Sequence, residues 1–201
     1  MEFVRLLRDE TYFCDEHAPL FATKTLGVPY LPSGESLPSD GYGEKMTMLF
    51  QLNLGEISPV LGLPDSGMVQ IFVSGDVCES GMYDDNHVVV RFLDSVDYDE
   101  EAPVGGFFTD NDNPFELAES RYEEGDNGDD EGLVLGGELD LYELSADSFE
   151  WVEQYPEYSV PLLRITAAET LGGEFDLYVL VSAEELENRQ ITQALVLFEE
   201  L

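Results

Sequence analysis

The only cysteines and histidines of the chain are the first candidates for chemistry. Cys14 and His17 are separated by two residues, whereas Cys78 and His87 lie far along the sequence. Thiolate and imidazole groups bind zinc, and a tetrahedral site would need all four side chains to converge. One short pair and one distant pair do not have the spacing of a zinc motif, so we expect no metal site here.

Two acidic loops resemble calcium-binding loops in part. Residues 110–115 read Asp-Asn-Asp-Asn-Pro-Phe, and residues 126–131 read Asp-Asn-Gly-Asp-Asp-Glu. An EF-hand loop needs oxygen ligands at its odd positions and a glycine at its sixth position. Pro114 and Phe115 break this pattern in the first loop, and Gly128 and Glu131 break it in the second. We therefore interpret both segments as solvated acidic loops.

Catalytic motifs are absent from the sequence. It contains no nucleophile elbow, no phosphate-binding P-loop and no glycine-rich dinucleotide-binding turn. A pair of carboxylates suited to acid–base chemistry cannot be chosen among 44 acidic residues, because only the fold decides which of them meet. We predict no catalytic residues and no cofactor, which favours a non-enzymatic role.

The best-defined elements lie between residues 23 and 73. Prolines and glycines are frequent over residues 27–43, which excludes a helix and predicts an ordered loop. Residues 46–54 form an apolar run in which Gln51 and Asn53 alternate with leucines, and residues 68–73 form a second apolar run. This alternation predicts two strands, each with a buried face, joined by a compact loop.

These motifs resemble the YwqG-like domain, a family without an established function. The corresponding segments are Thr-Lys-Thr-Leu-Gly-Val-Pro-Tyr-Leu-Pro at 23–32, Leu-Phe-Gln-Leu-Asn-Leu at 49–54 and Leu-Pro-Asp-Ser-Gly at 63–67. Leu26 replaces the first glycine of the family pattern, and Leu37 replaces its tryptophan. The resemblance implies one YwqG-like domain over residues 1–201.

The second half of the chain repeats features of the first. Residues 49–52 resemble residues 162–165, and the strand after Gly67 resembles the strand after Gly173. This comparison aligns Gln70 with Asp176. The expected fold is α+β and β-rich: a mixed sheet with mostly antiparallel strands and a few short helices, built by an internal duplication.

The remaining segments give simpler expectations. Residues 1–8 are compatible with a helix or an edge strand, and we favoured the helix. Residues 87–93, 162–167, 175–181 and 194–198 are predicted as strands. Residues 138–144 alternate as a half-buried strand would, or form a polar turn leading into one. Residues 151–161 are predicted as an aromatic, proline-containing connection. A capping box formed by Ser182 and Glu185 predicts a short helix after residue 182.

Charge is the extreme property of this composition. The chain has 44 acidic and 8 basic residues, a net charge of −36, and only two lysines, Lys24 and Lys45. Without a basic patch we expect no nucleic-acid ligand. The acidity indicates adaptation to high salt, because a Debye length of about 3 Å at 1 M salt screens the self-repulsion.

Residues 94–131 carry much of this charge, with 15 acidic residues and one arginine. We expect them to form an acidic, partly mobile insertion. No apolar run reaches the ~20 residues of a membrane helix, and residues 1–8 do not resemble a signal peptide, so we expect a cytoplasmic protein without a membrane partner. Two cysteines do not form a disulfide framework.

Four residues are candidates for ligand binding. Gln51 and Asn53 are polar within an apolar strand, Lys24 matches a lysine of the family pattern, and Trp151 with its neighbouring tyrosines could line a pocket. The alternative for Gln51 and Asn53 is that they bind loop backbone near residues 29–32. The alternative for Trp151 is that it covers an edge of the core.

Two classes of function follow. In the first, the protein is a non-catalytic binding or interaction module with a salt-adapted surface. In the second, it is an acidic nucleic-acid mimic or an immunity-type inhibitor whose partner is a basic protein. The sequence does not indicate the oligomeric state.

Overall fold

The computed structural model describes residues 3–8, 18–57, 65–74, 88–99, 120–125, 133–142, 144–165, 175–188, 191 and 194–200. Within these residues, ten strands form one antiparallel sheet in the order β10-β9-β8-β7-β1-β6-β2-β3-β4-β5. The strands are β1 (Phe3–Arg8), β2 (Lys24–Thr25), β3 (Thr47–Asn53), β4 (Met68–Val73), β5 (Val88–Leu93), β6 (Ser120–Glu124), β7 (Leu133–Gly136), β8 (Tyr158–Ile165), β9 (Phe175–Ser182) and β10 (Leu195–Glu200). The predicted β-rich α+β class with few short helices is confirmed.

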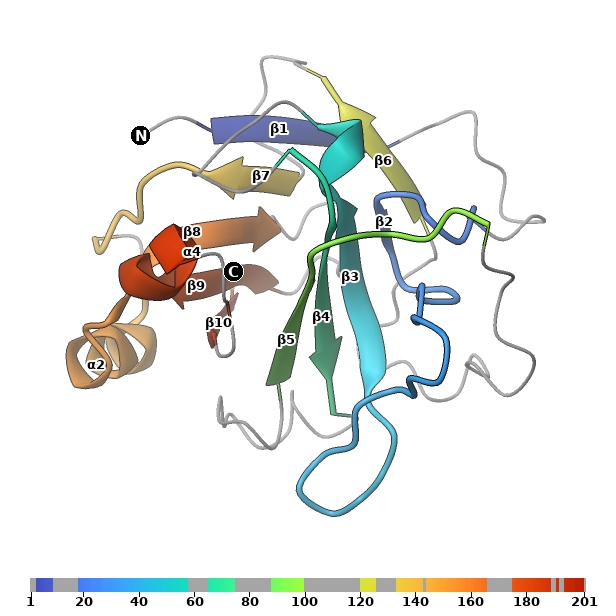
Figure 1. Ribbon diagram of the computed structural model, residues 1–201. Helices are drawn as coiled ribbons and strands as arrows, with labels where there is room; N and C mark the ends of the chain where they lie inside the picture. The colour runs from blue at the N-terminus through green and yellow to red at the C-terminus, as the bar shows by residue number, and fades with distance from the viewer. Residues whose placement is uncertain are drawn as a thin grey trace.

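Strand β6 joins the two halves of this sheet. It pairs with β1 at its C-terminal end and with β2 at its N-terminal end. The strands of the two halves run in different directions in Figure 1. One hydrophobic cluster contains Ile71 and Val90 from the first half and Val179 and Val196 from the second. The core therefore lies between the inner faces of the two halves.

The strand order is symmetric about the β1–β6 pair. Reading it from either end matches β5 with β10, β4 with β9, β3 with β8, β2 with β7 and β6 with β1. Each half thus contains four consecutive antiparallel strands, and the two halves exchange their first strands. This symmetry supports the internal duplication expected from the sequence.

Strand pairing fixes which residues are equivalent. Thr25 and Leu135 are each followed by two residues with positive φ, Leu26 and Gly27 in the first half and Gly136 and Gly137 in the second. Phe50 lies opposite Thr25, and Leu163 lies opposite Leu135, so residues 49–52 and 162–165 correspond as predicted. Gln70 and Tyr178 are the next cross-strand partners in the two halves. The alignment of Gln70 with Asp176 was therefore wrong by two residues. A shift of two residues leaves each side chain on the same face of the sheet, so an alternating sequence pattern cannot detect it.

Three short helices accompany the sheet in the described part of the chain. They are η1 (Leu54–Glu56), α2 (Ala146–Gln154) and α4 (Ala183–Asn188). Asn53 caps η1 by accepting from the amide of Gly55, and Ser145 caps α2 by accepting from that of Ser148. Figure 1 shows α2 and α4 together at the end of the second half. The helix predicted after residue 182 is confirmed by α4.

Three local predictions were wrong. Residues 3–8 form a strand, not a helix, because β1 is held between β7 and β6, partners that are distant in sequence. Residues 138–142 form no strand: positive φ angles at Gly136 and Gly137 turn the chain out of the sheet, and the turn that follows leads to helix α2, not to the strand that the turn alternative required. Residues 151–154 belong to helix α2, whose N-cap at Ser145 was overlooked.

Candidate functional site

Lys24 is buried beneath the loop that precedes β2. Its Nζ donates to the backbone oxygens of Pro19, at 3.0 Å, and of Val28, at 2.7 Å. Both acceptors belong to the chain on either side of β2. The lysine thereby holds the segment before β2 and the segment after it against the sheet, in a position that solvent does not reach.

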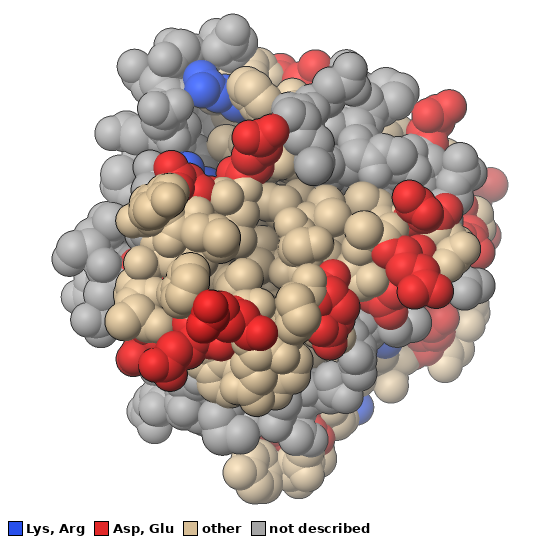
Figure 2. Space-filling model, turned by 90° about the vertical axis from the view of Figure 1, so that its left-hand side faces the viewer, with Lys and Arg blue, Asp and Glu red and all other residues tan. Residues whose placement is uncertain are grey.

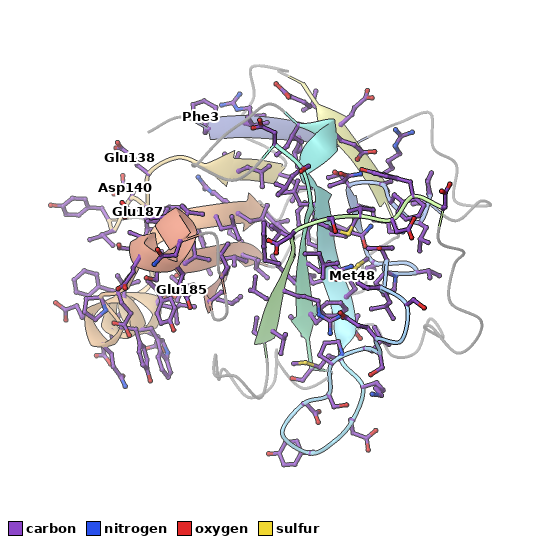
Figure 3. The ribbon with its side chains drawn as sticks, in the orientation of Figure 1. Phe3, Met48, Glu138, Asp140, Glu185 and Glu187 are labelled. Atoms are coloured by element: carbon purple, nitrogen blue, oxygen red, sulfur yellow. The ribbon has the colours of Figure 1, made fainter. Side chains whose placement is uncertain are left out.

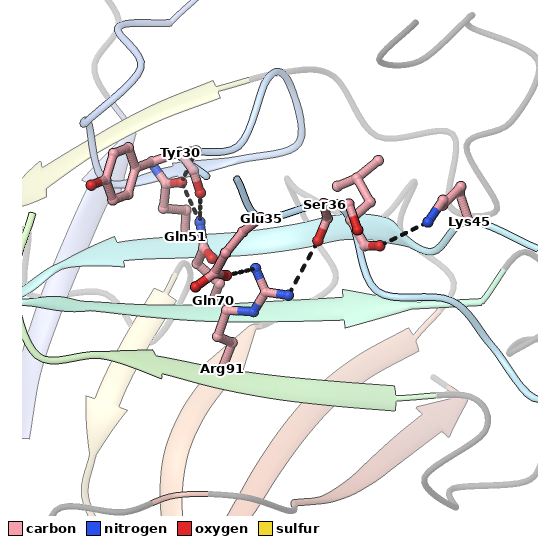
Figure 4. A network of polar contacts seen from close by, with 8 residues as sticks. Tyr30, Glu35, Ser36, Lys45, Gln51, Gln70 and Arg91 are labelled. Carbon is pink, nitrogen blue, oxygen red and sulfur yellow. Dashed lines mark hydrogen bonds and ion pairs between the residues drawn. The ribbon is translucent and has the colours of Figure 1, made fainter. Parts of the chain in front are cut away.

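Gln51 of the neighbouring strand β3 binds the same two segments. Its Nε2 donates to the backbone oxygens of Leu20 and Ala22, and its Oε1 accepts from the backbone N–H of Tyr30 at 2.9 Å. Gln70 completes the arrangement in Figure 4: its Nε2 donates to Oε1 of Gln51 and to the backbone oxygen of Tyr30. The two glutamines bind Tyr30 through its main chain.

Asn53 binds the segment before β2. Its Nδ2 donates to the backbone oxygen of Phe21 at 2.8 Å, its Oδ1 accepts from Gly55, and it contacts the hydroxyl of Tyr98. The structure therefore brings Lys24, Gln51 and Asn53 together in one buried network whose polar atoms bind loop backbone. Their roles in ligand binding remain predictions.

Trp151 lies apart from that network, on α2. Its ring stacks on Tyr155, with centroids 5.6 Å apart, and packs against a cluster that contains Tyr178 and Leu180 of β9. This placement matches the alternative in which the tryptophan covers an edge of the core. A ligand-binding role for Trp151 also remains a prediction.

Strand register reveals two equivalent rows of residues that cross the outer faces of the sheet. Residues directly opposite each other in antiparallel strands point to the same face. The first row consists of Arg121, Lys24, Gln51, Gln70 and Arg91. The second row consists of Arg5, Val134, Arg164, Tyr178 and Leu197. The rows contain five of the eight basic residues of the chain.

The first row is covered by residues 28–38, which we call the strap. Tyr30 of the strap is held by Gln51 and Gln70, as described above. At the outer end of the row, Arg91 pairs with Glu35 at 3.0 Å and donates to the backbone oxygen of Ser36 at 3.3 Å (Figure 4). The first row therefore binds a segment of its own chain.

The second row lines a hollow of about 150 Å³, which we call the arginine hollow. Its described lining consists of Phe3, Arg5, Val134, Gly136, Gly137, Glu138, Pro161, Arg164 and Tyr178. A second hollow adjoins it at Phe3 and Arg5 and reaches Glu124 and Gly125. Helix α2 covers Leu197 and part of Tyr178, so the open part of the row lies around its two arginines.

Aromatic rings and one carboxylate hold the guanidinium groups of the hollow. Arg164 donates from Nη2 to Oδ2 of Asp176 at 3.2 Å, and its Cζ lies 5.2 Å from the ring centre of Tyr178. The Cζ of Arg5 lies 5.6 Å from the ring centre of Phe3. Guanidinium groups bind planar acceptors with their N–H edges, and Arg164 binds Asp176 in this way.

Sequence reasoning missed Arg5, Arg164 and Tyr178. The available signal was scarcity: in a chain with 8 basic and 44 acidic residues, each arginine placed inside a strand is informative. Strand-to-strand register was still needed to show that Arg5 and Arg164 share a face. That register depends on pairing between segments that are distant in sequence.

The residues considered above as metal ligands lie in other parts of the chain. Cys14, His17, Cys78, His87 and both calcium-like loops lie outside the described residues, as does most of the acidic insertion at 94–131. In the described part, no group of three or more His, Cys, Asp or Glu side chains could hold a metal ion. No helix found there has the length and apolar character to cross a membrane.

Most of the sequence matches a known protein family. The family described as "Domain of unknown function (DUF1963)" matches residues 23–197. The chain belongs to this family. No curated protein matches the sequence. The DUF1963 match covers β2 to most of β10, and therefore both rows except Arg5, which β1 contributes from the residues before the match.

Proposed function

We propose that this DUF1963 domain is a non-catalytic binding module of the YwqG-like type, and that its ligand occupies the arginine hollow. One observation carries the proposal: the two halves present equivalent rows, and among the described residues a strap covers the first row only. Gln51 and Gln70 bind the main chain of Tyr30 there, whereas the equivalent Arg164 and Tyr178 line a hollow.

The lining of the hollow favours binding over reaction. Arg5 and Arg164 supply N–H donors, and Phe3, Pro161 and Tyr178 supply apolar surface. A few convergent polar groups on an apolar lining are characteristic of ligand sites. Arg164 is already held by Asp176, an arrangement that fixes a donor in place but supplies no nucleophile.

A ligand screen tests this site. Ligand-observed NMR with small anions, cations and neutral aromatic compounds should give hits on the wild-type protein that Val134→Trp removes, because the indole fills the hollow. Leu141→Trp adds the same ring at a residue that is 43% exposed and outside the hollow, and should retain the hits. Hits that survive Val134→Trp, or a screen without hits, would contradict the proposed site.

We also propose that the acidic surface is an adaptation to high salt in a cytoplasmic protein. Figure 2 shows acidic side chains spread over the displayed face, not gathered in one patch. Repulsion among these charges is screened at high ionic strength. The melting temperature, followed by circular dichroism, should rise steeply from 0.1 to 3 M potassium chloride. A protein that is stable at 0.1 M and indifferent to salt would contradict this adaptation.

A second candidate function, inhibition of a basic protein by an acidic surface, rests on the region around α2 and α4. The described residues 137–163 and 175–188 include no lysine or arginine. Figure 3 shows Glu138, Asp140, Glu185 and Glu187 on one side of the molecule. Such a surface complements a basic partner and steers its association.

Poly-L-lysine is a suitable probe for this second candidate. Neutralising Glu138, Asp140, Glu185 and Glu187 to their amides should weaken binding more than neutralising the exposed Glu44, Asp65, Asp99 and Glu123, and the difference should vanish as salt rises. Equal losses in the two variants would show that only net charge matters, and this candidate would fall.

A further inference from the structure

We infer that helix α2 and the turn before it bind a basic protein segment that also carries large apolar side chains. This inference rests on the second candidate function, an acidic surface with a basic partner, and names the chemistry of that partner. Exposed apolar side chains and the carboxylates beside them carry it. We call the following residues the α2 surface: Asp140, Leu141, Tyr142, Asp147, Phe149, Glu150 and Glu153.

Exposed apolar side chains gather in the α2 surface. Six large hydrophobic side chains are exposed among the described residues, and three of them, Leu141, Tyr142 and Phe149, lie within nine consecutive residues. Tyr142 is 98% exposed, and its backbone N–H donates to Oδ1 of Asp140 at 2.9 Å, a contact that orders the turn. Aromatic side chains on ordered backbone are effective anchors of protein interfaces, because little conformational freedom is lost when they are buried.

Phe149 lies on the solvent side of α2. The opposite side of the helix faces the sheet, because Trp151 and Tyr155 pack against side chains of β9 and β10. The solvent side consists of exposed residues, namely Ala146, Asp147, Phe149, Glu150, Glu153 and Gln154. Residues four apart on a helix are neighbours, so Phe149 lies beside Glu153. The phenylalanine remains in contact with water and gains burial only when another molecule covers the helix.

Carboxylates surround these apolar side chains. Asp140, Asp147, Glu150 and Glu153 are exposed, and no lysine or arginine of the described residues pairs with them. Figure 2 looks onto the side of the molecule on which Figure 1 places α2 and α4, and it shows acidic side chains spaced around uncharged surface. Charge complementarity therefore favours a basic partner over an anionic one.

The apolar side chains decide how such a partner is held. Attraction between exposed charges is screened beyond about 3 Å at 1 M salt, whereas the gain from burying apolar side chains depends on the area removed from water. A partner that contacts carboxylates alone, as the partner of a nucleic-acid mimic would, is released as salt rises. A partner that covers Tyr142 and Phe149 with its own apolar side chains stays bound. The partner that fits is therefore amphipathic, with lysines or arginines around apolar side chains.

Two helical peptides test this chemistry by fluorescence anisotropy. The first repeats leucine at positions i, i+3, i+4 and i+7 among lysines, and the second has alanine at every leucine position, so length and charge are equal and both residues favour helix. At 0.5 M potassium chloride the leucine peptide should bind the wild-type protein at least about tenfold more tightly than the alanine peptide, because only leucine covers the apolar side chains effectively.

Matched tyrosine variants locate the contact. Tyr142→Ser should reduce the preference for the leucine peptide about threefold or more, and adding Phe149→Ser should remove most of it. Tyr42→Ser is the control and should keep the preference. Tyr42 lies in the loop before β3, is 79% exposed, and follows Asp40 exactly as Tyr142 follows Asp140, with the same hydrogen bond from its backbone N–H. Circular dichroism verifies the fold of each variant.

The possible failures are distinguishable. Equal binding of the two peptides, or the same loss of preference in Tyr142→Ser and Tyr42→Ser, would overturn the inference. The second candidate function would survive that result if poly-L-lysine still distinguished the two amide variants, whereas absence of binding by either peptide would overturn both. Binding of phosphatidylcholine vesicles that is lost in the Tyr142→Ser, Phe149→Ser variant would assign the α2 surface to a membrane and would also overturn the inference.

Discussion

Gln70 donates its side-chain amide to the side-chain oxygen of Gln51 at 2.9 Å, across the β3–β4 pair, and both side chains are fully buried. This contact aligns the two glutamines so that Gln51 accepts from the N–H of Tyr30 and Gln70 donates to its C=O. Two neutral side-chain amides thus hydrogen-bond the main chain of the strap on this face of the sheet. At Tyr30 the strap is held by its main chain, whereas at its outer end the side chain of Glu35 pairs with Arg91.

Gln51→Leu should destabilise the protein by about 3 kcal/mol, because it leaves several buried groups unpaired at about 1–3 kcal/mol each, offset in part by relaxation of the loop. Urea unfolding at fixed high salt measures the loss. Arg164→Gln, at the equivalent position of the second half, should cost at most about 1 kcal/mol, since its ion pair is partly exposed. A similar cost for both would contradict the assigned difference between the rows.

Lys24→Met should destabilise the protein by about 2–4 kcal/mol, since the oxygens of Pro19 and Val28 lose a charged donor and the new side chain supplies none. Unfolding by urea gives the value, and proteolysis at residues 18–30 reports whether the loop has loosened. Lys45→Met is the control, because Lys45 is exposed. If Lys24→Met were as stable as the wild type, the cost of burying the charge would equal the gain from its hydrogen bonds.

The sequence predicted the parts of the fold that depend on local pattern. Strands β3 and β4 were recognised from alternation, and α4 from its capping box. Strand β1 was not recognised, because Val4 and Leu6 acquire a buried face only when β7 and β6 lie on either side of them. The exchange of first strands between halves depends on contacts across more than 100 residues, which no local pattern encodes.

The candidate site shows the same division. Lys24, Gln51 and Asn53 were predicted from residue type and family resemblance, and the structure places them together. The arginine hollow depends on the register of three strands, so Arg5 and Arg164 gave no joint signal. The two-residue error at Gln70 illustrates the reason, since a period of two identifies a face but not a position along it.

Gly67→Ala should be far more costly than Gly34→Ala. Both glycines have positive φ angles, +108° and +83°, where alanine is strained by about 1 kcal/mol. A Cβ on Gly67 would come within 2.3 Å of the backbone oxygen of Leu93, whereas a Cβ on Gly34 would meet nothing within 4 Å. We therefore expect a loss of about 3 kcal/mol or more for Gly67→Ala. Similar melting temperatures for the two variants would show that the β4–β5 edge yields to the added methyl group.

Leu26 is a buried leucine whose φ of +52° is left-handed. Leu26→Gly removes a strain of about 1–2 kcal/mol. It also removes a buried side chain from the core, at about 2–5 kcal/mol as judged from leucine truncations, so the variant should be less stable than the wild type.

Leu26→Ala separates these two effects, since it loses nearly the same apolar surface but keeps the left-handed strain. It should be less stable than Leu26→Gly by about 1 kcal/mol, the reverse of the usual order, in which alanine is favoured by about 0.5–1 kcal/mol within regular structure. Urea unfolding of the two variants side by side measures this order. The usual order would mean that residue 26 leaves the left-handed region once the leucine is removed, and that burial of the leucine side chain is what holds the backbone there.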